Sequence, residues 1–143
     1  MKYIKEERIK PIIIGGIVGG VLFSFLPFPT YIIPYLLSGV ITAYLISKEF
    51  PRSNMEYIVA GGLSGGIGGF VSWCLDMLII IAAVPSMVSY YIDPSMTGYY
   101  IEEVYMESRI AVDWYITYIP FYVVIGAISG VIGGILYGKL KNK

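Results

Sequence analysis

Residues 61–69 read GGLSGGIGG, and residues 126–134 read GAISGVIGG, so glycine and serine recur at matching places. A third cluster, GGIVGG, occupies residues 15–20. Fifteen of the 17 glycines fall in these clusters or just after them, at Gly138. The match between the second and third clusters indicates an internal repeat. These stretches predict the fold, because their spacing determines how closely neighbouring helices can approach.

Glycines four residues apart share one face of a helix, so each cluster predicts a groove that runs along a helix. Lipid tails offer no hydrophobic drive between helices, and such grooves allow backbones to approach closely. The predicted helix-packing residues are Gly15, Gly16, Gly19, Gly20, Gly61, Gly65, Gly69, Gly126, Gly130, Gly134 and Gly138. The alternative is a permeation path lined by glycine carbonyls, which requires broken helices facing a water-filled cavity.

The composition places these clusters in a membrane protein. Of 143 residues, 57% are hydrophobic, 14% are charged and none is His. The mean hydropathy of +0.73 is far above that of a soluble domain, in which ~45–50% of residues are apolar. We therefore expect an integral membrane protein, and we exclude a disordered chain, a nucleic-acid binder and an ordinary soluble enzyme.

Charges and prolines divide the chain into four predicted spans, at about residues 11–27, 30–47, 57–84 and 114–138. Lys10 and Lys48 bracket 37 uncharged residues, and a hydrocarbon core of ~30 Å needs only ~20. Pro27 and Pro29 split this stretch into a helical hairpin, and we expect Pro85 to end the third helix. The predicted fold is all-α: one polytopic domain over residues 1–143, a four-helix transmembrane bundle with a short extracellular amphipathic helix.

The basic residues predict the orientation. Nine of the ten lie before the first span, between the second and third, or after the fourth. The positive-inside rule therefore predicts a multi-pass protein of the cell membrane with both termini in the cytoplasm.

Few residues in the spans could carry chemistry. Without His, the usual zinc and haem ligand sets cannot be built, and a single Cys74 cannot form an internal disulfide. We expect no catalytic residue, no metal and no cofactor. Ser64, Ser72 and Ser129 are expected to hydrogen-bond across helices or to their own backbone.

Asp76 is the only charged residue well inside a predicted span, and intramembrane carboxylates often mark ion or proton paths. It is our candidate ion or solute site. The alternative is that Asp76 lies at the outer interface, because about twenty residues separate it from Tyr57.

The outer loop, residues 86–113, is long enough to be functional. From Tyr99 to Asp113 the pattern predicts a short amphipathic helix that shields the outer ends of the bundle. The sharper alternative is a lid over an outward-facing cavity, or an acidic collar that concentrates cations. The candidate lid residues are Tyr99, Tyr100, Glu102, Glu103, Tyr105 and Glu107.

Residues 13–72 resemble one half of a group of small glycine-rich archaeal membrane proteins of unknown function. The shared pattern is a Gly-Gly-x-x-Gly-Gly span, a proline-containing turn, a second span, a charged link and a glycine-rich third span. Here these parts are residues 15–20, 27–34, 48–52 and 61–69. The resemblance implies a small polytopic membrane protein and brings no activity or site residues.

Two functions are compatible with these observations. The first is a non-enzymatic scaffold or accessory subunit, which binds copies of itself or another membrane protein in the lipid bilayer through glycine-lined helix faces. The alternative is a channel or transporter for an ion or small solute that uses Asp76 and an outward-facing cavity. A membrane enzyme acting on lipid would need several convergent polar groups, and the spans offer one carboxylate.

Overall fold

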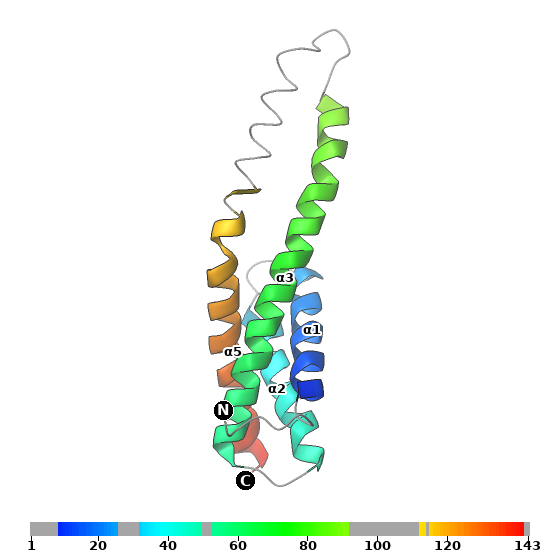
Figure 1. Cartoon of the computed structure of the whole chain (residues 1–143). Helices are drawn as coiled ribbons and strands as arrows, with labels where there is room; N and C mark the ends of the chain where they lie inside the picture. Colours follow the sequence, from blue (N-terminus) through cyan, green and yellow to red (C-terminus); the bar gives the residue numbers. More distant parts are fainter. Residues whose placement is uncertain (1–8, 26–31, 50–52, 92–111, 114, 142–143) are drawn as a thin grey trace.

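The computed structural model describes residues 9–25, 32–49, 53–91, 112–113 and 115–141, apart from the side chains of Glu49 and residues 83–91. The named elements are α1 (Ile9–Phe25), α2 (Ile32–Glu49), α3 (Asn54–Tyr91) and α5 (Ile119–Lys141). The described part is helical nearly throughout, which confirms the all-α class. The start of α1 and the end of α5 lie at the same end of the bundle, so the helices alternate in direction (Figure 1).

Helices α1 and α2 overlap the first two predicted spans, at about residues 11–27 and 30–47. They contain 17 and 18 residues, which corresponds to ~26 Å each at 1.5 Å per residue. Pro34 is the third residue of α2, where a backbone N–H would have no partner within the helix. The predicted turn at Pro27 and Pro29 lies outside the described residues.

Helix α3 corrects one prediction. It does not end before Pro85 but continues to Tyr91, seven residues past the predicted end at residue 84. A proline inside a helix removes one backbone hydrogen bond, a loss that membrane helices tolerate. With 38 residues α3 is ~57 Å long, and it extends well past the ends of α1 and α2 (Figure 1).

Within the part of the chain that the structure describes, two helical segments are long and apolar enough to cross a membrane, Asn54–Ala82 and Tyr115–Lys141. The second segment includes one turn before α5, in which the amide of Tyr118 donates to the carbonyl of Tyr115 at 3.1 Å. Helices α1 and α2 are apolar but shorter. All four pack together: α3 contacts α5, α1 and α2, and α2 also contacts α1 and α5.

The most extensive helix contact joins α3 to α5, and glycines line it on both sides. At Gly65, the place that a Cβ would occupy is filled by the carbonyl oxygen of Gly126, and the carbonyl of Gly65 fills the same place at Gly126. Gly61 and Gly130 form the same reciprocal contact one turn away. The residue numbers of each contacting pair add up to 191. A constant sum means that α5 runs antiparallel to α3 with a fixed register.

The same register continues in both directions along this interface. Gly69 lies against the carbonyl of Tyr122 towards one end. Towards the other, Gly134 lies against the carbonyl of Tyr57. Gly138 then faces the Asn54 side chain, whose Oδ1 is 3.2 Å from a Cβ placed on this glycine. The glycine interface therefore extends over most of α5.

Helix α1 presents two rows of glycine to two neighbours. Gly15 lies against the hydroxyl of Thr42 on α2. Gly20 faces α3 instead, and a Cβ placed on it would lie 2.7 Å from the carbonyl oxygen of Gly68. Gly19 and Gly16 extend the two rows towards α2 and α3 respectively. The double glycines of residues 15–20 thus place α1 in the groove between α2 and α3.

Two close contacts involve glycines that we did not include among the helix-packing residues. Gly39 of α2 lies against the carbonyl of Gly130, and Gly133 of α5 lies against the carbonyl of Leu36. Together they bring α2 onto α5. Gly39 stands alone in its span, so no glycine spacing could have predicted its role.

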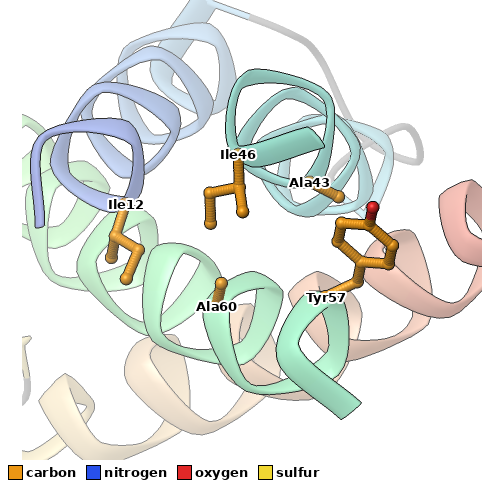
Figure 2. Packing of buried hydrophobic residues seen from close by; sticks show 5 residues of the cluster. All are labelled: Ile12, Ala43, Ile46, Tyr57 and Ala60. Carbon is orange, nitrogen blue, oxygen red and sulfur yellow. The ribbon is translucent and has the colours of Figure 1, made fainter. Parts of the chain in front are cut away.

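Larger apolar side chains fill the end of the bundle where α1 begins. Ile12, Ala43, Ile46, Tyr57 and Ala60 are all at most 5% exposed and form one cluster. Figure 2 shows them converging from α1, α2 and α3. This cluster fills the space between α1, α2 and α3 at the same end as the contacts of Gly134 and Gly138 with α3.

We predict that Gly65→Ala destabilises the protein by about 1–3 kcal/mol, because the new methyl group overpacks the contact with the Gly126 carbonyl. The neighbouring Gly66→Ala is the matched control, since its Cβ would meet no atom closer than 3.8 Å. Alanine also favours helix over glycine, so we expect Gly66→Ala to be neutral or slightly stabilising. Thermal unfolding followed by circular dichroism in mild detergent measures both, and equal midpoints would contradict the described interface.

Candidate functional site

Three hydroxyl groups meet in the buried centre of the bundle. The hydroxyls of Ser38 and Thr42, one turn apart on α2, each lie 2.7 Å from the Ser64 hydroxyl on α3. All three side chains are fully buried. The missing side chain of Gly15 makes room for this cluster, because the Thr42 hydroxyl occupies the place of its Cβ.

No side chain of the Ser38–Thr42–Ser64 cluster faces lipid. Their hydroxyl groups find hydrogen-bond partners within the cluster. A polar group that lacks a partner in a membrane is costly, so these hydroxyls hold α2 and α3 in one register. Hydrogen bonds between membrane helices contribute about 0.6 kcal/mol on average. The expectation that Ser64 bonds across helices is confirmed.

A second polar contact lies two turns further along α3. The hydroxyls of Tyr35 and Ser72 are 2.5 Å apart, and both side chains are buried. The Ser72 hydroxyl also donates to the Gly69 carbonyl at 2.9 Å. Phe23 of α1 stacks on the Tyr35 ring at 4.7 Å between centroids. The hydrogen bond between Tyr35 and Ser72 joins α2 to α3, and the Phe23 ring of α1 packs over the tyrosine that makes it.

Asp76 lies one turn beyond Ser72 on the same face of α3. The Tyr122 hydroxyl of α5 donates to its carboxylate at 3.1 Å. The hydroxyl of Ser24, in the last turn of α1, donates to the Gly20 carbonyl of its own helix at 3.4 Å. The Asp76 side chain is half-buried, so the carboxylate joins α3 to α5 while it keeps access to its surroundings.

Aromatic side chains surround the level of Asp76. The Trp73 indole N–H donates to the Tyr115 carbonyl at 2.8 Å, and Tyr118 packs on Phe121 with ring centroids 5.6 Å apart. Such belts are typical of membrane–water interfaces. Asp76 also follows Asn54 by 22 residues, a rise of about 33 Å, slightly more than a hydrocarbon core of ~30 Å. We therefore favour an interfacial Asp76, which stays a prediction.

The remaining candidates contribute little to this site. The six candidate lid residues, between Tyr99 and Glu107, lie outside the described residues. Cys74 is partly buried and free. Within the described ranges, no group of three His, Cys, Asp or Glu side chains is arranged to hold a metal ion.

Sequence reasoning missed the hydroxyl partners contributed by α2 and α5. Tyr35, Ser38 and Thr42 recur at spacings of three and four in an otherwise apolar span, which is the signal that could have identified a polar face. Tyr122 offers no such signal, because it is one of several aromatic residues near the start of the fourth predicted span. Only the fold brings it to Asp76.

The comparisons with known proteins give one match. A family model described as MJ1491 transmembrane domain matches residues 9–143. No curated protein and no solved structure matches the chain.

The depth of Asp76 can be measured by cysteine labelling in a Cys74→Ser background. We expect Asp76→Cys to react with a membrane-impermeant maleimide in opened membrane vesicles, because the position is half-buried at the aromatic belt. Ser64→Cys is the matched control on the same helix and should react only after denaturation, since Ser64 is fully buried. Protection at both positions would place Asp76 inside the hydrocarbon core instead.

Proposed function

The chain belongs to the MJ1491 transmembrane domain family, and we propose that this membrane protein is a non-enzymatic scaffold or accessory subunit. It would bind copies of itself or another membrane protein in the bilayer. The observation that carries this proposal is the division between interior and surface. Glycines and hydroxyl groups that could line a path or take part in a reaction contact one another inside the bundle, whereas large apolar side chains are exposed on the surface of every helix.

Every glycine predicted to pack helices already contacts a neighbouring helix inside the bundle. All eleven are buried within one chain, and a carbonyl or side chain of a neighbouring helix lies against each. A partner could reach these faces only by opening the bundle. We therefore expect partners to bind at other surfaces than the glycine-lined faces.

Two exposed aliphatic faces are better suited to a partner or to lipid. The face on α1 consists of Ile13, Ile14, Ile17, Val18, Val21 and Leu22. The face on α5 consists of Val124, Ile125, Ile128 and Ile132. β-Branched side chains have few rotamers to lose when they pack, so a rigid partner helix can bind such a face at small entropic cost.

The proposal includes an orientation. We infer that the protein lies in the cell membrane with both termini in the cytoplasm. The support is that the start of α1 and the end of α5 lie at one end (Figure 1). Among the described residues, Lys10, Lys139 and Lys141 belong to those helix ends, and nine of the ten basic residues of the sequence fall in segments predicted to be cytoplasmic.

A second candidate function is a path for an ion or small solute. It is supported by the polar side chains of Ser64, Ser72 and Asp76, which follow one another along α3 at spacings of eight and four residues. Gly68 interrupts this row, and the Tyr35 ring packs beside it, 3.6 Å from an ideal Cβ. The hydroxyl groups therefore form separate contacts between helices, which favours a structural role over a continuous path.

Native mass spectrometry of the protein extracted gently from its own membrane tests the proposal. We expect a defined oligomer or a stoichiometric protein partner. Ile17→Trp and Ile128→Trp enlarge side chains on the two exposed faces, and at least one should reduce the assembled fraction without changing the thermal midpoint.

A monomer that carries only a bound ion or solute would contradict the scaffold and favour the path. Flux through proteoliposomes then separates the two functions further. The scaffold predicts equal flux for wild type and Asp76→Asn, whereas a path through Asp76 predicts that the substitution changes it.

A further inference from the structure

The last turns of α2 and α5 lie side by side at the basic end of the bundle. The Ser47 hydroxyl of α2 is 2.6 Å from the Tyr137 hydroxyl of α5. The Lys141 ammonium, in the last turn of α5, donates to the Ser47 carbonyl at 3.3 Å. A cation at this place is favoured by the free carbonyls at the end of α2. We call this junction the α2–α5 seam.

A second cation, Lys48, belongs to the last turn of α2. Lys48 follows Ser47 in the chain, and its ammonium lies 4.6 Å from the centroid of the Tyr44 ring. The Tyr44 ring in turn packs edge-on against Tyr137, with centroids 6.3 Å apart. The α2–α5 seam therefore carries Lys48 on the Tyr44 ring and Lys141 on the Ser47 carbonyl, from positions 93 residues apart in the sequence.

The surface next to the two ammonium groups is apolar and exposed. Leu37 and Tyr44 lie seven residues apart on α2, hence on one face, and they are 40% and 46% exposed. On α5, Leu136 precedes the seam residue Tyr137 and is 47% exposed. This surface runs from the charged end of the seam towards the middle of the bundle.

We propose that the α2–α5 seam binds an anionic phospholipid. Lys48 and Lys141 hold the headgroup phosphate, and one acyl chain lies along Leu37, Tyr44 and Leu136. Lysine supplies compact positive charge with three donors, and basic pockets between membrane helices bind anionic headgroups. The apolar surface continuous with the two cations favours a lipid over a soluble phosphate. The inference requires only that the chain lies in a membrane, so it is independent of the scaffold.

Lipid titration followed by native mass spectrometry tests the seam directly. The full chain in mild detergent is titrated with phosphatidylglycerol and, separately, with phosphatidylcholine. We expect phosphatidylglycerol to bind about tenfold more tightly, since each lysine near an anionic headgroup contributes on the order of 1 kcal/mol. Lys48→Gln/Lys141→Gln should abolish most of this preference.

The matched control is Lys10→Gln/Lys139→Gln, which removes the same charge from exposed lysines at the same end. Lys139 is two residues from Tyr137 and therefore points away from the seam. We expect the control to keep the preference within about twofold of wild type, well short of the tenfold that the two seam lysines supply. An equal loss in both double variants would overturn the site, because it would show only diffuse attraction to a basic surface.

Two further measurements keep the inference falsifiable if the seam variant does not fold. Phosphatidylglycerol should raise the thermal midpoint of the wild type more than phosphatidylcholine does, and equal shifts would overturn the proposal. Inorganic phosphate at millimolar concentration should not displace the bound phosphatidylglycerol. Displacement by phosphate would assign the lysines to a soluble anion instead of a lipid.

Discussion

The structure depends on the absence of a Cβ atom at a few places on α3 and α5. At Gly61, Gly65, Gly126 and Gly130 the carbonyl oxygen of the opposite helix occupies the space that a side chain would need. Backbones at this separation gain dispersion contacts along their whole length, which is the principal attraction available between helices in lipid. The antiparallel register of the pair follows, and α1 and α2 then pack on α3.

The same close approach determines what the interior can contain. Only short polar side chains fit between helices that nearly touch, and Ser38, Thr42 and Ser64 form such a set. Because their hydroxyls pair with one another, they add specificity to the register without leaving a polar group in lipid. Groups that remain accessible lie nearer the ends, with Asp76 at one and the lysines of the α2–α5 seam at the other. Recognition by this protein is therefore expected at its surface and ends.

The all-α class predicted from the sequence is confirmed, because it depends on the local spacing of apolar residues. The predicted spans and glycine faces rest on the same local signals, and α1, α2 and α5 overlap the spans predicted for them. Sequence reasoning was wrong at Pro85, since a proline's effect on a helix depends on what surrounds it. It could not tell whether the glycine faces meet within one chain or between chains, as both produce the same periodicity. The hydrogen bond between Tyr122 and Asp76 could not be predicted from the sequence either, because it depends on the register of α3 against α5.

The central claim is that the glycine faces of α3 and α5 meet within one chain, and a disulfide tests it most directly. A Cβ placed on Gly66 would lie 3.8 Å from the Cβ of Ala127, a separation suited to a disulfide. Gly66→Cys/Ala127→Cys in a Cys74→Ser background should therefore oxidise to a cross-linked monomer, seen by non-reducing electrophoresis and peptide mapping. A covalent dimer joined between residues 66 and 127 of different chains would contradict the account.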